Sequence, residues 1–496
     1  MDTQDKLLFA TDEPLELGLG FHNVGTGVLR YAKEEVQKKV EKHYGQRCGH
    51  IPMNAKTVGV LIDSPDLEMR SQIAYLSELY GRDIKILTPK DLKKYKSQPF
   101  VVPYIQVPET EKYIGEINAV SWGLPGSMTH ALKNKSEFCR IVDDLDIKEF
   151  RLPEYKITYL QDVAAVSKKF LIQIEEMYDK AGLKNYYPLG VMLRASDEDG
   201  NYGCSLAYER GGFIIVVPNG DMENAKLYGN WDEALASSER ILDAAMDQEK
   251  EPRVVISRYI DTIDSPGMSA VILDGKIHSL GWNGQLQAIG SKACIGTSSY
   301  KPVNTYLRKV QKAFEDQTSE LFETFLRKVA LMCKVDLNKI AGVTNIDMML
   351  PSEKEKELQR NRGQKVDFYF AECNPRWTNY TDAILTIIGV NRQKQTIRNM
   401  KKVIKDGIYT IDKYPLPRAV DPRLVRQFIF EKDKLLKKDG TRIICRMAKR
   451  PMGVILAGDI MRGEQEMENI VQSLPANNWG TQPNFLLQEE SLYIAD

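Results

Sequence analysis

A short segment around residue 372 carries side chains that suit a magnesium ion and a phosphate. It reads Phe370-Ala-Glu-Cys-Asn-Pro-Arg376. Its apolar start and proline end predict a strand, in which alternate side chains share a face, so Glu372 and Asn374 point the same way. Carboxylate and amide oxygens are ligands that Mg²⁺ prefers, and Arg376 can hold the phosphate or carboxylate beside the metal. A half-buried strand end with a solvated turn is the alternative interpretation.

A second strand upstream supplies another acid. Polar and apolar residues alternate in Asn345-Ile-Asp-Met-Met-Leu350, which places Asp347 on the face away from the core. We expect this strand to pair antiparallel with the first, so that Asp347 joins the oxygen ligands. The charged residues between the two strands, 351–365, predict an exposed loop.

An aspartate on one strand and Glu-x-Asn-Pro-Arg on the next together resemble the metal-binding end of the ATP-grasp superfamily. The resemblance implies an ATP-grasp fold, in which two α+β subdomains clasp ATP. It also implies that Asp347, Glu372 and Asn374 hold Mg²⁺ ions that bridge the ATP phosphates, while Arg376 stabilises the transferring phosphoryl group. ATP and Mg²⁺ are therefore the expected cofactors.

Two further segments fit the same resemblance. Lys135 matches a lysine that contacts ATP phosphate in the family. An exposed lysine at the N-terminus of a helix is the alternative interpretation. Residues 189–204 resemble the strand and glycine-rich loop that cover the phosphates, where Gly200 and Gly203 provide backbone freedom. This chain has Arg194 where most members have lysine. Arginine keeps the positive charge, but its hydrogen-bond donors form a planar fork. The loop's three acids would repel phosphate if they pointed inward, and a plain hairpin turn also fits.

The contacts to adenine and substrate are less defined by the sequence. Residues 253–260 predict the strand before the adenine hinge, but the acid or glutamine of many relatives is missing near Ser257 and Arg258. Backbone groups can recognise adenine without it. Asn283 and Gln285 share one face of a later strand. They are candidate substrate contacts or, equally, polar groups at a strand edge.

Within the superfamily, the layout resembles peptide ligases and carrier-protein aminoacyl ligases of natural-product pathways. That resemblance implies a carboxylate–amine ligase, which activates a carboxylate as an acyl phosphate and forms an amide or peptide bond. The amine would be an amino acid, a peptide or a carrier-protein-bound acceptor. Two alternatives stay open. One is a small-molecule kinase on the same fold, and the other is a catalytically impaired nucleotide-binding regulatory protein, which Arg194 and the missing hinge acid favour.

Composition argues against several other classes of protein. In 496 residues, 68 Lys plus Arg balance 68 Asp plus Glu, which disfavours bulk nucleic-acid binding and a polybasic membrane surface. The sequence has no apolar run of about 18 residues, no secretory signal and no P-loop motif. Its seven scattered cysteines fit reduced thiols. We therefore expect a cytoplasmic protein with small-molecule partners and leave its oligomeric state open, homo-oligomer included.

Three regions are expected along the chain. Residues 1–130 show a β-α-β pattern, with strands at 56–63 and 83–87 around a helix at 67–80, which predicts a small parallel pre-ATP-grasp domain. Residues 131–410 are expected to form the ATP-grasp core. Residues 411–496 are expected to form a short β-rich C-terminal domain, with strands at 425–430, 441–445 and 452–457 and a helix at 464–474.

Overall fold

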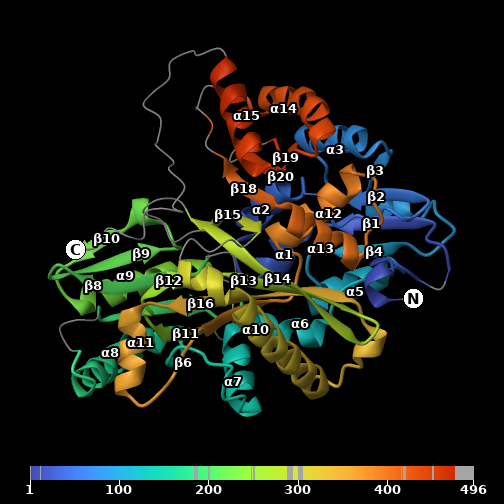
Figure 1. Ribbon diagram of the computed structural model, residues 1–496. Helices are drawn as coiled ribbons and strands as arrows, with labels where there is room; N and C mark the ends of the chain where they lie inside the picture. Colours follow the sequence, from blue (N-terminus) through green and yellow to red (C-terminus); the bar gives the residue numbers. More distant parts are fainter. Residues whose placement is uncertain are drawn as a thin grey trace.

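The first five strands form a parallel sheet in the order β3-β2-β1-β4-β5 (Figure 1), which confirms the predicted β-α-β pattern. The computed structural model describes residues 2–474 except 12, 48, 184–187, 199–201, 247, 248, 250, 251, 288–293, 300–304, 415, 417–419 and 449–451. The strands are β1 (Leu17–Phe21), β2 (Thr57–Leu61), β3 (Ile84–Leu87), β4 (Phe100–Pro103) and β5 (Val120–Ser121). The accompanying helices are α1 (Val24–Val28), α2 (Glu34–Tyr44), α3 (Leu67–Tyr80), α4 (Pro89–Leu92) and α5 (Pro108–Glu116).

A second sheet is antiparallel and holds six described strands in the order β10-β9-β8-β7-β11-β6. Two helices, α8 (Val163–Lys180) and α9 (Trp231–Ala245), pack against it over one apolar core. The strands are β6 (Tyr155–Tyr159), β7 (Gly190–Ala195), β8 (Cys204–Arg210), β9 (Phe213–Pro218), β10 (Lys226–Tyr228) and β11 (Arg253–Arg258).

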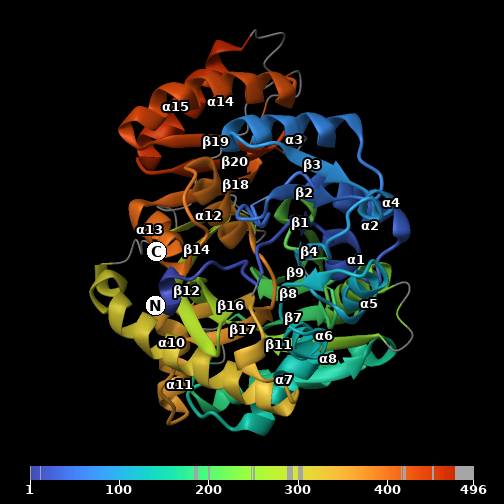
Figure 2. The ribbon, with the colours of Figure 1, turned by 90° about the vertical axis from the view of Figure 1, so that its right-hand side faces the viewer.

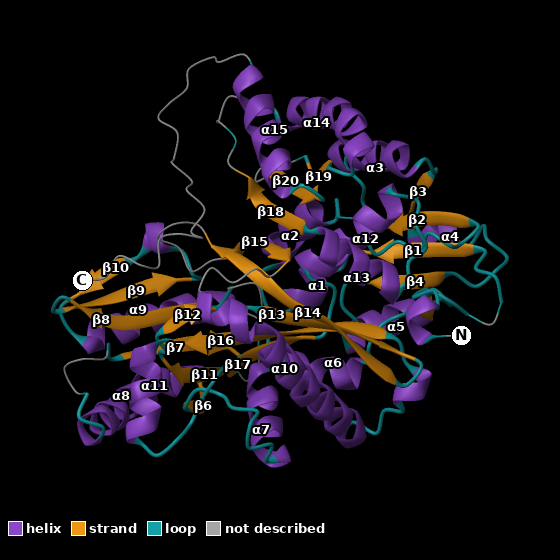
Figure 3. Ribbon diagram, viewed as in Figure 1, coloured by secondary structure: helices purple, strands orange, loops and turns teal. Residues whose placement is uncertain are grey.

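The third sheet is also antiparallel and joins strands from distant parts of the sequence. Its described order is β12-β16-β13-β14-β15-β18-β20-β19, and β17 pairs with β16. Helices α7 and α10 cover one side of it (Figure 3). The strands are β12 (Thr262–Asp264), β13 (Gly267–Leu273), β14 (Lys276–Gln287), β15 (Cys294–Ser299), β16 (Gly342–Pro351), β17 (Tyr369–Asn374), β18 (Ile408–Tyr414), β19 (Arg442–Met447) and β20 (Met452–Ala457). The helices nearby are α6 (Gly126–Lys133), α7 (Lys135–Leu145) and α10 (Thr305–Met332).

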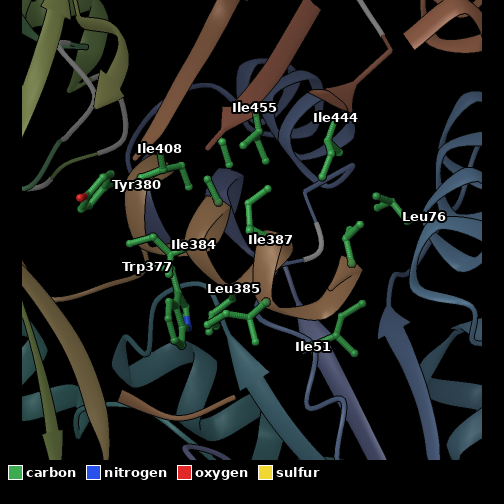
Figure 4. Close-up of a cluster of buried hydrophobic side chains, with 14 of the residues drawn as sticks. Ile51, Leu76, Trp377, Tyr380, Ile384, Leu385, Ile387, Ile408, Ile444 and Ile455 are labelled. Carbon is green, nitrogen blue, oxygen red and sulfur yellow. The ribbon is translucent and has the colours of Figure 1, made fainter. Parts of the chain in front are cut away.

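The largest apolar core lies between the N-terminal sheet and the last strands of the chain. Helix α12 (Asn379–Val390) runs through it, and nearly all of its side chains are buried (Figure 4). Helices α13 (Ile397–Asp406), α14 (Pro422–Leu436) and α15 (Ile460–Ser473) complete this part. Figure 2 shows α3, α14 and α15 together at one end, where Arg426 donates to Gln72 at 3.1 Å. Among the described residues, we find no helix that is both long and apolar enough to cross a membrane.

Two local predictions are wrong. Residues 425–430 belong to helix α14 rather than to a strand, because the buried Val425, Ile429 and Leu436 recur at helical spacing after an Asp421 cap. Residues 353–361 form helix α11 (Glu353–Asn361) rather than an exposed loop. Strand β18 crosses the predicted boundary at residue 410 and pairs with β20. The domain boundaries themselves stay predictions.

Candidate active site

The register of β16 and β17 brings the predicted oxygen ligands together. Asp347 lies opposite Glu372, and Asn345 lies opposite Asn374, with a bulge immediately after the Asp347–Glu372 pair. Bulges locally bend a strand and re-aim its side chains. Antiparallel pairing places opposite side chains on one face, so the sheet puts these four polar residues at one place.

Three amide groups surround the carboxylate of Asp347. Gln285 donates to its Oδ1 at 3.0 Å and Asn345 donates to the same oxygen at 2.8 Å. Asn374 donates to its Oδ2 at 2.9 Å. Hydrogen bonds to an ionised carboxylate are stronger than those between neutral groups. The carboxylate is therefore held in one orientation by strands β14, β16 and β17.

Two basic side chains converge on Glu372 from other elements. Lys135, at the first position of α7, places its Nζ 3.7 Å from Glu372 Oε2. Arg194, on β7, places a guanidinium nitrogen 3.4 Å from the same oxygen. The side chain of Lys135 is only 9% exposed, whereas that of Glu372 is 25% exposed. Positive charge thus gathers beside the acids, where phosphate oxygens could be held.

Arg376 connects the acids to the N-terminal sheet. Its guanidinium donates to Asn374 Oδ1 at 3.0 Å and to the Tyr104 hydroxyl at 3.1 Å. A β-bridge joins its backbone to Ile105, just after β4. Arg376 therefore lies where the antiparallel sheet meets the end of the parallel sheet.

The remaining predicted residues are placed less uniformly. Asn283 is buried on β14, where its Oδ1 accepts from the Ser269 hydroxyl at 3.5 Å. Gly203 has a φ of +68°, which favours glycine, and an added Cβ would lie 2.9 Å from Ala195 Cβ. Gly200 lies outside the described residues. The structure thus brings Lys135, Arg194, Gln285 and the β16–β17 residues together, and Ser269 joins Asn283 to Asn345.

Two acids of the predicted phosphate loop, Asp197 and Glu198, bind residues that follow α1 or end α6, and the third, Asp199, lies outside the described residues. Asp197 forms ion pairs with Arg30 at 3.0 Å and Lys133 at 3.1 Å. Glu198 accepts from the backbone N–H of Tyr31 at 3.0 Å, and burial raises its pKa to about 7. Its backbone carbonyl accepts from Lys135. The repulsion of phosphate that inward-pointing acids would cause is therefore avoided for these two.

Cys373, the cysteine between Glu372 and Asn374, is not expected to act as a nucleophile. Burial raises the pKa of Cys373 to about 12, so its thiol stays protonated near neutral pH. The thiolate is the nucleophilic form. The site therefore depends on its oxygen and cationic groups.

The fold can be compared with solved structures. Neither a known family model nor any curated protein matches the sequence. N5-carboxyaminoimidazole synthase from Aspergillus clavatus, an ATP-grasp enzyme solved with ADP and 5-aminoimidazole ribonucleotide, matches 92% of this chain and 100% of its own. The TM-score is 0.50 at 10% identity.

The chain has the ATP-grasp fold. Biotin carboxylase from Campylobacter jejuni is also similar, with a TM-score of 0.48, 11% identity, and coverage of 92% of this chain and 91% of that one. In this ATP-grasp fold β17 pairs with β16, and the Ala371 carbonyl of β17 accepts from Arg194 at 3.3 Å. The predicted fold class is confirmed.

Sequence reasoning missed several residues of the candidate site in this ATP-grasp fold. Asn345 orients Asp347 directly, and Ser269 donates to Asn345 Oδ1 at 3.0 Å. Asn345 lies two residues before Asp347, so the alternation already placed it on the same face. Tyr104 carried no comparable signal, because only the tertiary fold brings β4 to Arg376.

The donor set suits magnesium. Within the residues that the structure describes, no three His, Cys, Asp or Glu side chains gather as a metal site on their own. Mg²⁺, however, commonly takes one or two carboxylates together with substrate phosphates. Asp347, Glu372 and Asn374 offer two carboxylates and one amide oxygen on paired strands. These three residues could hold the ion between the sheet and a bound nucleotide.

Proposed function

We propose that this protein is an ATP-dependent carboxylate–amine ligase that forms an amide or peptide bond through an acyl phosphate. One observation carries the proposal: Asp347, Glu372 and Asn374 gather on paired strands with Lys135, Arg194 and Arg376 around them. Two carboxylates beside three basic side chains suit a metal and a triphosphate better than they suit an apolar ligand. The ADP in the Aspergillus clavatus structure is consistent with ATP as substrate.

Phosphoryl transfer depends mainly on positioning and on neutralising charge. Mg²⁺, held by Asp347, Glu372 and Asn374, would neutralise charge on the β- and γ-phosphates. Lys135 and Arg194 already stand beside Glu372, and would exchange part of that ion pairing for phosphate oxygens. Gly203, with its positive φ, would let the neighbouring backbone N–H groups approach the phosphates, as the predicted glycine-rich loop requires.

The reaction starts from a carboxylate, which is a poor electrophile because its oxygen is a poor leaving group. A carboxylate oxygen attacks the γ-phosphorus, and ADP leaves. The amine then attacks the acyl carbon, inorganic phosphate leaves, and the nitrogen loses a proton. Arg376 would stabilise the negative charge of the transferring group, because its guanidinium is fixed by Asn374 and Tyr104.

A paired substitution tests the site. We expect Glu372→Gln to abolish magnesium-dependent ADP release and to leave the fold intact. Glu353→Gln is the matched control, since Glu353 is 76% exposed on helix α11, and it should keep wild-type turnover. Wild-type turnover in Glu372→Gln would remove this residue from the machinery.

A second experiment tests the reaction class. ADP release is screened with pairs of amino acids and short peptides, and hydroxylamine is added to trap the acyl phosphate. We expect an acyl hydroxamate that depends on ATP and on the carboxylate. Phosphate transfer to a hydroxyl without hydroxamate would favour a small-molecule kinase. ATP binding without any ADP release would favour the catalytically impaired nucleotide-binding regulatory protein.

A further inference from the structure

Helix α11 connects the two strands that carry the candidate metal ligands. The chain runs from β16, which holds Asp347, through α11 to β17, which holds Glu372. Although the helix is rich in charge, one of its sides is buried, and the buried residues there are Glu355, Leu358 and Gln359. Buried polar side chains need hydrogen-bond partners. The partners of α11 show what the helix does for the candidate active site.

The buried leucine of α11 packs in the core of the six-stranded sheet. Leu358 is fully buried and belongs to the apolar core that this sheet forms with α8 and α9. Asn361, the last residue of α11, donates to the carbonyl of Ala181, just after α8, at 2.9 Å. Figure 1 shows α11 beside α8 and β16. The helix is therefore continuous with strands of the large sheet but packs against the six-stranded sheet.

The first turn of α11 holds the segment that joins the two sheets. Residues 259–261 lead from β11, in the six-stranded sheet, to β12, in the large sheet. Before this segment, Arg258 donates to both oxygens of Glu355, at 2.8 and 2.7 Å. At its end, Ser352 donates to Asp261 twice, from its hydroxyl to the carboxylate at 2.6 Å and from its backbone N–H to the carbonyl at 3.0 Å. One helix thus fixes both ends of the connection.

A second passage of the chain between the sheets meets the same group of side chains. The chain enters the six-stranded sheet at β6, and Glu154 directly precedes this strand. Glu154 accepts from Arg258 Nε at 2.7 Å and also from Arg362, which follows α11. Arg258 therefore links both passages to α11, with charged hydrogen bonds that are short and buried.

The candidate active site takes its side chains from both sheets, so its geometry depends on how the sheets are held. Arg194, on β7, reaches the Ala371 carbonyl at 3.3 Å and Glu372 at 3.4 Å. Both distances exceed the value of about 2.7–2.9 Å that is usual for bonds of charged groups. Functional groups must be held to within about 0.5 Å of the productive geometry. The shorter contacts of α11 are better able to set the distance between the sheets.

We propose that Ser352 and Glu355 are positioning residues, which hold the connection at residues 259–261 so that Arg194 faces Glu372 before a nucleotide binds. The inference rests on the proposed function, in which the nucleotide phosphates contact Arg194 and the ion that Glu372 holds. Without α11, the nucleotide itself must bring the two sheets into place. Its affinity then falls in proportion to the fraction of molecules that are already arranged, whereas turnover at saturation is kept.

Two substitutions at residue 352 test this role without removing the helix cap. Ser352 is the N-cap of α11, where its hydroxyl accepts from the Glu355 N–H at 3.3 Å, and aspartate and asparagine are equally good caps. Ser352→Asp sets a second carboxylate against Asp261, and like charges at this distance repel. Ser352→Asn offers Asp261 an amide donor instead. The two variants therefore differ in the link to Asp261 and share the same capped helix.

The affinity for ADP is measured by calorimetry with Mg²⁺ on the full-length protein, which requires no ligase activity. We expect ADP to bind Ser352→Asp at least tenfold more weakly than it binds the wild-type protein, with the same number of sites per chain. Ser352→Asn should stay within threefold of the wild type, and so should Glu353→Gln, which is exposed on the same helix. In ADP release, Ser352→Asp should raise KM for ATP at least tenfold and change kcat less than threefold.

The outcomes separate this inference from the ligase activity. Equal affinities in Ser352→Asp and Ser352→Asn overturn the positioning role, and so does a loss of binding sites without a change in affinity, because that indicates misfolded protein. Hydroxamate trapping together with equal affinities would leave the ligase standing without α11. The expected affinities without hydroxamate trapping would refute the ligase chemistry and leave the positioning role. A wild-type protein that binds no ADP would overturn both.

Discussion

Helix α11 carries a buried ion pair whose removal gives a quantitative test of the structure. Glu355 is fully buried and holds both guanidinium NH groups of Arg258, at 2.8 and 2.7 Å. It also accepts from the Tyr369 hydroxyl at 2.6 Å and from Gln359 at 2.8 Å. The pair joins α11 to the end of β11, the strand before the predicted adenine hinge.

Glu355→Gln keeps the size of the side chain and removes its charge. Arg258 would keep Glu154, 2.7 Å away, but would lose a charged bidentate partner in a place without solvent. Breaking a buried pair on one side typically costs 3–5 kcal/mol. Because one acceptor oxygen and the Glu154 contact remain, we expect the lower end, about 3 kcal/mol.

Hydrogen exchange measures this cost locally, which matters in a chain of several sheets that need not unfold as one unit. A loss of about 3 kcal/mol should accelerate exchange of α11 and β11 amides roughly 100-fold, since each 1.36 kcal/mol is tenfold. Glu353→Gln, on the same helix but in an exposed pair with Lys356, should change exchange by less than about fivefold. Matching exchange in the two variants would refute the buried pair.

Three further outcomes are expected. Gly203→Ala should lower the free energy of unfolding by about 2 kcal/mol in urea titrations, because a φ of +68° strains alanine and its Cβ would crowd Ala195. The pKa of Glu198 is raised to about 7, against 4.5 in the unfolded chain. The folded state therefore binds this proton more tightly, which stabilises it fully below about pH 4.5 and no longer once the pH has risen through 7. Relative to Glu198→Gln, the wild-type protein should therefore lose up to about 3 kcal/mol between about pH 5 and 8. Asn345→Ala should raise the magnesium concentration for half-maximal ADP release about 10-fold or more, since it frees Asp347 to rotate.

Strictly local patterns in the sequence were enough for much of the fold. Helix α3 covers the predicted residues 67–80, because its apolar positions recur at helical spacing between an Asp66 cap and the left-handed Gly81. The alternation around Asp347 and Glu372 predicted two strands with their polar residues on one face, and β16 and β17 pair in that way. The two-residue alternation of side chains in a strand is set by the backbone itself, so it can be recognised in the sequence without knowing the tertiary contacts.

Charged partners far away in the sequence explain where two acidic side chains lie. Residues 351–365 are so highly charged that a solvated loop was the natural expectation, yet Glu355 turns inward because Arg258, 97 residues away, neutralises it. Asp197 likewise finds Arg30 and Lys133 instead of repelling a phosphate. A charged residue is predicted to face solvent unless its partner is known. A partner far away in the sequence leaves no local pattern that could reveal the pair.

The acidic part of the candidate active site is organised before any ligand binds. Around Asp347 the protein supplies three amide donors, so the carboxylate is oriented before a metal or nucleotide arrives. Arg376 links this site to the N-terminal sheet, because it donates to Asn374 on one side and to Tyr104 on the other. The reacting end of a substrate would thus be fixed by side chains on paired strands, which hold a site more precisely than loops do.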